Sequence, residues 1–107
     1  MLPTDILTAI LDSFADPVVF ADGDHIIRYV NPAGARKYGE GLVGKSVLAC
    51  HNAQSRRLMM EIWSAMLEGE QERLIAQDDR RRVYMRAVRD PEGNLLGYYE
   101  RYTGPAD

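Results

Sequence analysis

The strongest constraint on the fold of this chain is a strand–turn–strand pattern that ends on an asparagine–proline pair. Residues 17–21 form a short run rich in β-branched and aromatic residues, and residues 25–30 form a second such run. Asp22-Gly23-Asp24 lies between them and is typical of a turn that joins two antiparallel strands. Asn31 favours the N-cap of a helix and Pro32 its first position. We therefore predict a β-hairpin that leads directly into a short helix.

Helical periodicity occurs on both sides of this hairpin. Before it, apolar residues recur every three or four positions, which predicts an amphipathic helix within residues 1–15, with Thr4 as the candidate N-cap. After it, glycines between residues 39 and 44 predict turns. A longer helix is predicted to begin at Ser55 and to end at Gly69, where a left-handed C-cap is easily formed. Its apolar stripe comprises Leu58, Met59, Ile62, Trp63 and Met66.

Three further strands are predicted in the last third of the chain. They span residues 72–77, 82–89 and 95–102, and the last two are joined by a loop of Asp, Pro, Glu, Gly and Asn at 90–94. The order of the elements predicts an α+β domain with one five-stranded antiparallel sheet and helices packed on one face. We expect residues 16–107 to form this core, preceded by the amphipathic helix of residues 1–15.

Composition narrows the classes of protein to which the chain could belong. A net charge of −3 over 107 residues gives no reason to expect nucleic-acid binding. The single cysteine, Cys50, excludes an internal disulfide and fits a reducing compartment. The first residues lack the pattern of a signal peptide, and nowhere do about 18 apolar residues run together. We expect a cytoplasmic domain that makes no contact with a membrane.

Four segments carry a family resemblance and follow one another in order. They are the hairpin and helix of residues 16–39, the turn GLVGKSV at 41–47, the junction LEGEQERLI at 67–75 and the closing hairpin RAVRDPEGNLLGYYERYT at 86–103. Together they resemble the PAS superfamily of sensor domains over nearly the whole chain. The resemblance implies a signalling module in a regulatory protein, such as a two-component histidine kinase or a transcription regulator, with a downstream effector domain. It does not imply an enzyme, and no catalytic motif stands out in the sequence.

The resemblance also implies where a ligand would lie. Some PAS domains hold haem, flavin or a small metabolite between the sheet and the long helix, while others bind no known ligand and serve for dimerisation or protein interaction. Both functions stay open, and so does the identity of the cofactor. The tentative pocket comprises His51, Met59, Ile62, Tyr84, Arg86 and Tyr98.

His51 is the candidate axial ligand if the cofactor is haem, because neutral imidazole is a strong donor to iron. The alternative is that His51 only packs or forms a hydrogen bond while Asn52 or Ser55 caps the long helix. In haem sensors of this family the histidine lies inside the long helix, where Leu58 or Met59 stands here, and Met59 is a weaker donor. Cys50 falls three residues too late for the thiol of a flavin light sensor, so we do not expect flavin.

The closing hairpin offers a second set of candidates. Alternation along the strand at 82–89 places Tyr84 and Arg86 on one face and Met85 on the other. If the first pair faced the pocket, Arg86 could hold an anionic ligand. The alternative is an ion pair between Arg86 and Glu100 across the sheet. His25, which follows the first turn, is expected to be exposed.

The first helix is the candidate surface for a protein partner. If the long helix already covers the core, the apolar stripe of the first helix needs another surface to pack against. In PAS proteins such leading helices often pack against a second copy of the chain. We therefore expect a homodimer with an interface made by Leu7, Ile10, Leu11 and Phe14.

Overall fold

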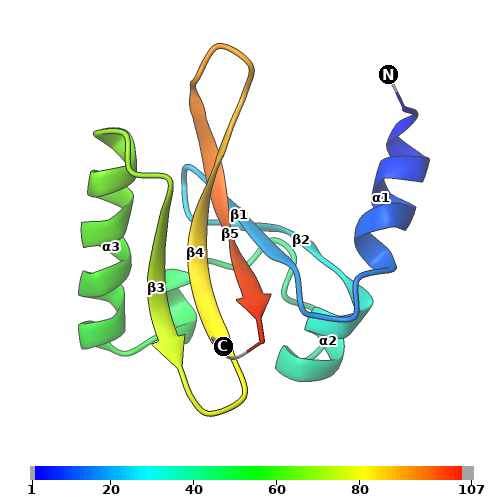
Figure 1. The fold of residues 1–107 in the computed structure, drawn as a ribbon, viewed down its shortest axis with the longest axis horizontal. Coiled ribbons are helices and arrows are strands. Elements are labelled where there is room, and N and C mark those ends of the chain that lie inside the picture. The colour runs from blue at the N-terminus through cyan, green and yellow to red at the C-terminus, as the bar shows by residue number, and fades with distance from the viewer. Residues whose placement is uncertain (1, 105–107) are drawn as a thin grey trace.

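The computed structural model of the protein describes residues 2–104 and has the predicted α+β architecture (Figure 1). The structure does not describe Met1, residues 105–107 or the side chain of Cys50. Residues 105–107 are part of the core predicted for residues 16–107, so that end of the prediction lies outside the described residues. The described elements are, in chain order, α1 (Thr4–Asp12), β1 (Val19–Asp22), β2 (Ile27–Val30), α2 (Pro32–Tyr38), η1 (Leu48–Cys50), α3 (Ala53–Leu67), β3 (Glu72–Gln77), β4 (Arg82–Arg89) and β5 (Leu95–Thr103).

The five strands form one antiparallel sheet in the order β2-β1-β5-β4-β3. Both predicted hairpins, β1–β2 and β4–β5, are confirmed. The two hairpins are joined into one sheet by the pairing of β1 with β5, in which Ala21 lies opposite Tyr98. Gly97 is required there, because a Cβ at this position would collide with the carbonyl of Ala21 and the ring of Phe20.

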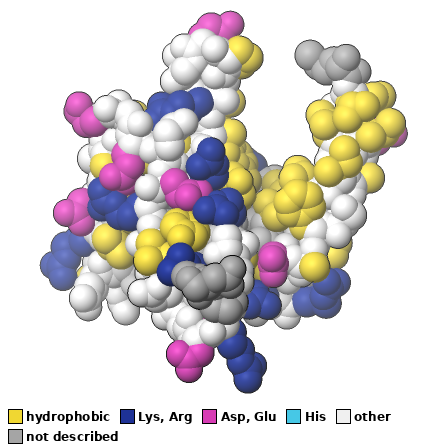
Figure 2. Space-filling model, viewed as in Figure 1, with side chains coloured by type: hydrophobic (Ala, Val, Ile, Leu, Met, Phe, Trp, Pro, Cys, Tyr) yellow, Lys and Arg dark blue, Asp and Glu magenta, His cyan; other side chains and the backbone are white. Residues whose placement is uncertain are grey.

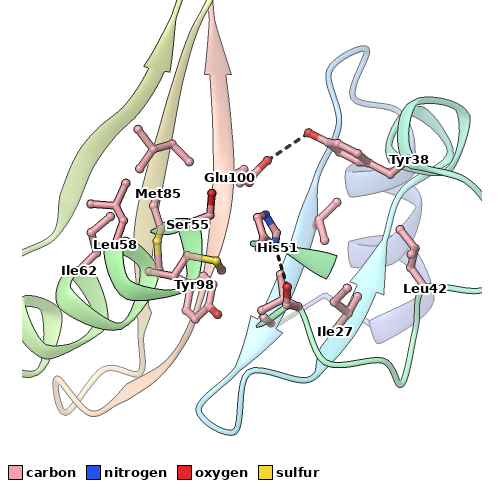
Figure 3. A pocket seen from close by; sticks show the side chains of 15 residues that line it. Ile27, Tyr38, Leu42, His51, Ser55, Leu58, Ile62, Met85, Tyr98 and Glu100 are labelled. Carbon is pink, nitrogen blue, oxygen red and sulfur yellow. Dashed lines mark hydrogen bonds between the residues drawn. The ribbon is translucent and has the colours of Figure 1, made fainter. Parts of the chain in front are cut away.

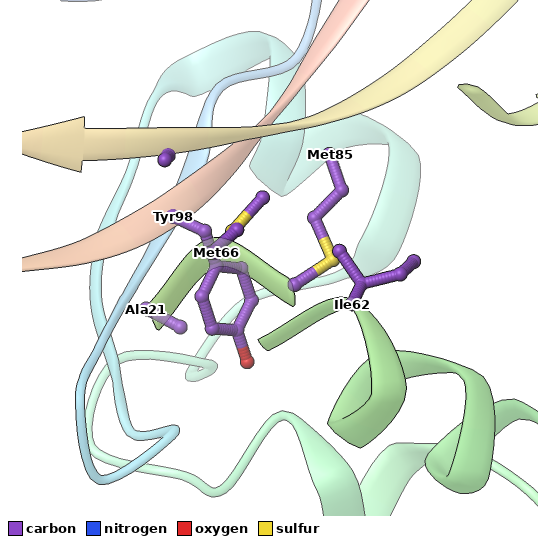
Figure 4. Packing of buried hydrophobic residues seen from close by; sticks show 6 residues of the cluster. Ala21, Ile62, Met66, Met85 and Tyr98 are labelled. Atoms are coloured by element: carbon purple, nitrogen blue, oxygen red, sulfur yellow. The ribbon is translucent and has the colours of Figure 1, made fainter. Parts of the chain in front are cut away.

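The core lies between α3 and the inner face of the sheet (Figure 4). The period of α3 places Ile62 and Met66 one turn apart, and both are fully buried. Alternation along β4 turns Met85 toward them. The rest of the buried cluster comprises Ala21, Ala87 and Tyr98. Burying these apolar side chains removes them from water, which fixes α3 across the sheet.

Asn31 connects the hairpin to the helices on either side of it. Its side chain is fully buried, and its Oδ1 accepts hydrogen bonds from the amides of Val18 and Gly34, both at 2.8 Å. The second of these bonds caps α2, as the sequence predicts. Its Nδ2 donates to the carbonyls of Asp16, at 3.0 Å, and Leu11, at 3.3 Å.

Two helix starts differ from their predicted positions. Thr4 is not the N-cap of α1, because Pro3 occupies that position and Thr4 is already helical. The structure also begins α3 at Ala53, two residues before Ser55. The reason is that Asn52, one of the two capping candidates, accepts a hydrogen bond from the Ser55 amide at 2.8 Å and so starts the helix earlier.

Arg89, a residue of β4, caps the carboxyl-terminal end of α3. Arg89 of β4 donates from Nη2 to the carbonyl of Met66 at 2.5 Å and to that of Glu70 at 3.3 Å. Its Nε donates to Gln71. A cation at this end of a helix satisfies free carbonyls and complements the helix dipole. Gly69 follows with a φ of 116°, so the predicted stop is confirmed.

Helix α1 stands away from the sheet (Figure 1). None of its residues is buried, and hydrophobic side chains gather on it beside a hollow in the surface (Figure 2). Two hydrogen bonds hold its last turn, from Tyr29 Oη to Asp12 at 2.5 Å and from Asn31 to Leu11. No helix within residues 2–104 has the length and apolar character needed to cross a bilayer.

Replacing Asn31 by Asp tests the importance of this residue for the fold. The carboxylate retains an acceptor for Val18 and Gly34 but places oxygen instead of NH₂ against the carbonyls of Leu11 and Asp16. We expect the free energy of unfolding in urea to fall by about 3 kcal/mol. The matched control is Asn52→Asp, where an exposed cap needs only an acceptor, and we expect a change within about 0.5 kcal/mol. Equal losses in both variants would contradict the role given to Asn31.

Candidate functional site

A cavity of about 430 Å³ lies between α3, the segment around η1 and the inner face of the sheet (Figure 3). Its wall is mostly aliphatic, with side chains from both ends of the sheet and from α3. The lining residues are Val19, Ala21, Ile27, Tyr38, Leu42, Val47, His51, Ser55, Leu58, Met59, Ile62, Ile75, Met85, Tyr98 and Glu100. Small-molecule sites have this size and this largely apolar character.

One carboxylate, that of Glu100 on β5, belongs to the cavity wall. Two tyrosine hydroxyls lie within hydrogen-bonding distance of its Oε2, Tyr38 at 3.2 Å and Tyr102 at 3.1 Å, and they also lie against each other. Each hydroxyl has one proton, so the three oxygens share two protons, and at least one of them is donated to the carboxylate. The bond from Tyr38 spans from the end of α2 to β5 at one side of the cavity (Figure 3). Burial raises the pKa of both tyrosines, so they stay protonated and act as donors.

His51 lines the cavity just after η1, with its ring between the two walls shown in Figure 3. Its Nδ1 lies 2.8 Å from the carbonyl of Val47. Because a carbonyl only accepts, Nδ1 carries the proton, and Nε2 of the neutral ring has a lone pair. The main chain of His51 is held as well, since Arg56 donates to its carbonyl at 2.7 Å.

His25 is buried, contrary to the expectation that it is exposed. Only 8% of it is accessible, and its Nδ1 is 2.8 Å from the hydroxyl of Tyr98. Its ring meets Trp63 edge to face at a centroid distance of 5.2 Å. The reason lies in the backbone: His25 has a φ of 64°, which turns its side chain inward at the end of the β1–β2 turn.

Four of the six predicted pocket residues lie together on the cavity wall, namely His51, Met59, Ile62 and Tyr98. The placement of Tyr84 and Arg86 in the pocket is wrong, because the register of β4 turns Met85 inward and these two outward. Arg86 does not pair with Glu100 either, since its Nη1 donates to Glu72 at 3.2 Å.

The outward residues form a charged cluster of their own on the far face of the sheet. Glu72 also accepts two hydrogen bonds from Arg101, both at 2.8 Å, and the guanidinium of Arg101 lies 4.6 Å from the centre of the Tyr84 ring. The hydrogen bonds from Arg101 lower the pKa of Glu72, although burial opposes this. This cluster is an ion-pair network on a partly exposed face, and it is not part of the cavity.

Sequence reasoning missed several residues of the cavity, above all Tyr38 and Leu42. Tyr38 is the last residue of α2, and Leu42 lies in the glycine-rich stretch that follows, where no periodic pattern shows which side chains turn inward. The sharing of one face by Tyr98 and Glu100 is the signal that could have placed Glu100 in the wall.

The donor groups of the cavity differ from those that a metal site or a haem group needs. Among the described residues, no three His, Cys, Asp or Glu side chains come together as a metal site. The lone pair of His51 suits an axial haem ligand. The lining, however, holds the carboxylate of Glu100 and neither Lys nor Arg, so it offers no cation to a pair of haem propionates. The wall therefore does not fit haem as a whole.

The family profile described as the PAS fold matches residues 11–103. The chain therefore belongs to the PAS domain superfamily, whose members are generally sensory or regulatory modules. This confirms the resemblance drawn from the sequence. No curated protein matches the chain significantly in sequence.

Solved structures of the same fold cover nearly all of the chain. The C-terminal domain of a Streptococcus mutans protein is 21% identical with a TM-score of 0.79, over 96% of this chain and 85% of that one. A sensory box sensor histidine kinase from Vibrio cholerae is 14% identical with a TM-score of 0.65, over 95% and 91%. The PAS domain of BvgS from Bordetella pertussis is 14% identical with a TM-score of 0.65, over 96% and 86%. At these identities the likeness concerns the fold.

The buried histidine predicts how stability depends on pH. Burial lowers the pKa of His25 below its ordinary 6.5, despite the opposing pull of Asp22 and Asp24. The unfolded chain therefore binds a proton near pH 6.5 that the folded protein does not yet bind, so the free energy of unfolding falls as pH drops from about 7 to 5. In His25→Asn, which tolerates the positive φ, we expect a shallower dependence over this window. Urea unfolding at several pH values measures it, and an unchanged slope would contradict the assignment.

Proposed function

We propose that this PAS domain is a sensor that binds a small, largely apolar molecule in the cavity between α3 and the sheet. The observation that carries the proposal is the cavity itself, at about 430 Å³ and with a mostly aliphatic wall. A space of this kind inside a small domain leaves favourable packing unmade, which a ligand of matching shape would supply. We also propose that the domain acts in the cytoplasm, without catalysis, and passes its signal to an effector domain such as a histidine kinase or a transcription regulator.

The large side chains of α3 support a ligand-binding role over a ligand-free one. A cavity filled by these residues would favour the alternative function, a domain used only for interaction. Met66 is packed into the core instead, Trp63 lies against His25, and Met60 is 40% exposed. Met59 alone among these four lines the cavity, and it leaves the space open.

The route of the signal follows from the cavity wall. Val19 and Ile27 line the cavity and belong to the two strands of the first hairpin. The same hairpin is bonded to α1 through Tyr29 and Asn31. A ligand that displaces this hairpin therefore moves the base of α1, so the occupancy of the cavity is coupled to the orientation of the helix.

Helix α1 is the proposed site of homodimerisation. Its apolar residues are well exposed, with Ile10 at 45% and Phe14, just beyond the helix end, at 48%. The other members of the predicted interface, Leu7 and Leu11, are also exposed. A second copy of the chain carries the same stripe, so two helices related by a twofold axis would cover each other. The proposal is a dimer that buries this stripe and joins the two sensor domains.

Haem is the other candidate ligand that the sequence suggests, and His51 supports it through the lone pair on Nε2. The charge of the cavity wall speaks against it. The visible spectrum of the protein during titration with hemin decides between the two. A Soret band that saturates at one haem per chain and is lost in His51→Ala would replace the present proposal with a haem sensor.

Filling the cavity should abolish ligand binding. Ser55 lies on the wall in the first turn of α3, so the ring of Ser55→Phe would enter the space. With the neutral apolar dye Nile red as a probe, we expect saturable fluorescence enhancement in the wild type and at least about tenfold weaker binding in this variant. The matched control is Ser64→Phe, on the same helix but exposed and outside the lining, and its binding should equal that of the wild type. Equal binding by all three proteins, or none by the wild type, would overturn the proposal.

Dimerisation is tested by placing a charge in the apolar stripe. Ile10→Glu would bury a carboxylate in the proposed interface, so we expect the molar mass from light scattering to fall from that of two chains to that of one. Ala9 is also exposed and lies on the opposite side of the helix, so Ala9→Glu should leave the dimer intact. A wild-type protein that stays monomeric at high concentration would contradict the proposed interface.

A further inference from the structure

The polar groups of the cavity wall indicate what kind of head group a ligand would carry. This inference rests on the proposed function, since it concerns the ligand of the same cavity. Five polar residues line the space, namely Tyr38, His51, Ser55, Tyr98 and Glu100. A ligand can form hydrogen bonds only with those groups that have a donor or an acceptor not already used inside the protein.

The two tyrosine hydroxyls each have a hydrogen-bond partner inside the protein. Tyr38 donates within its cluster with Glu100 and Tyr102. The hydroxyl of Tyr98 lies 2.8 Å from His25 Nδ1. His51 likewise donates from Nδ1 to the carbonyl of Val47. The protons of Tyr38 and of His51 Nδ1 are therefore engaged before a ligand arrives, and the hydroxyl of Tyr98 already has His25 as a partner.

Two acceptor atoms of the cavity wall, in contrast, have no hydrogen-bond partner among the described residues. Both hydrogen bonds to Glu100 end on Oε2, and no bond to its Oε1 is found within residues 2–104. Since Nδ1 of His51 donates to the Val47 carbonyl, Nε2 is the ring nitrogen left to accept a hydrogen bond. The wall thus offers a carboxylate oxygen and an imidazole nitrogen, with the serine hydroxyl as the one flexible group.

The charges around Glu100 also favour a ligand with a cationic head group. Among the described residues it has no ion-pair partner, while Arg86 and Arg101 are taken up by Glu72 on the other face of the sheet. Lys37 and Arg81 lie over the ring of Tyr102, at 5.0 Å and 5.8 Å from its centre. Neither belongs to the cavity lining, so the carboxylate is the formal charge that a bound molecule meets.

We propose that the ligand is a primary amine with an apolar body, whose ammonium group binds Glu100 while the body occupies the aliphatic part of the cavity. An ammonium supplies only donors, which matches a wall whose free groups are acceptors, and the interaction with a carboxylate is charge-assisted. A carboxylic acid of the same shape would be repelled by Glu100, and an alcohol would lack the charge. The size of the cavity suits an amine with a medium-length alkyl or aromatic body.

The test uses three probes with one body and different heads, decylamine, decanol and decanoate, which compete with Nile red at concentrations below micelle formation. For the wild type we expect decylamine to bind at least about tenfold more tightly than decanol, with decanoate the weakest. In Glu100→Gln the preference for the amine over the alcohol should fall to about threefold or less. The matched control is Glu72→Gln, the same change on the opposite face of the sheet, which should retain the wild-type preference.

The outcomes separate this inference from the function on which it rests. Equal binding of decylamine and decanol by the wild type would overturn the inference while leaving an apolar ligand site in place, and this result needs no variant to fold. A preference that survives Glu100→Gln would also overturn it. Failure of Nile red and of all three probes to bind would instead overturn the proposed function.

Discussion

The side chain of Asn31 is the interaction on which the arrangement of this domain depends. A buried amide has two acceptor sites and two donors, and here all four are used, by the amides of Val18 and Gly34 and by the carbonyls of Leu11 and Asp16. Leu11 lies in the last turn of α1 and Gly34 in the first turn of α2, while Asp16 and Val18 lie in the segment between α1 and β1. No apolar residue could join them, because their backbone groups would then be buried without partners.

The cavity depends on the same junction. Asn31 determines where β2 ends and α2 begins, and α2 in turn carries Tyr38 to the side of the cavity where it meets Glu100. On the opposite side, Arg89 holds the end of α3 against the sheet. Polar contacts therefore hold α2 against β5 and the end of α3 against β4, in addition to the buried cluster that packs α3 on the sheet. The cavity lies beside this cluster, so the packing of α3 does not require that the cavity be filled by side chains.

Local signals in the sequence were sufficient for the elements and insufficient for the site. Asn31-Pro32 and the turns at 22–24 and 90–94 act over a few residues, and the structure confirms each of them. Alternation along β4 shows correctly that Tyr84 and Arg86 share a face. It does not show that this face points outward, because that depends on the pairing of β1 with β5 across most of the chain. The contact between Tyr38 and Glu100 joins residues 62 positions apart, which no local pattern encodes.

Among the described residues, the hydrogen bonds that join α1 to the rest of the domain lie at its last turn, so the helix can act as a lever. Nine helical residues extend about 13 Å from the two hydrogen bonds at its base. A rotation of the hairpin by about 10° would therefore carry the far end of the helix through about 2 Å, an amplification that grows with length. In the proposed dimer, such a displacement would exceed the tolerance of a packed helix pair, so a small adjustment around the cavity would select between distinct arrangements of the two chains. The geometry suits a binary switch better than a graded one.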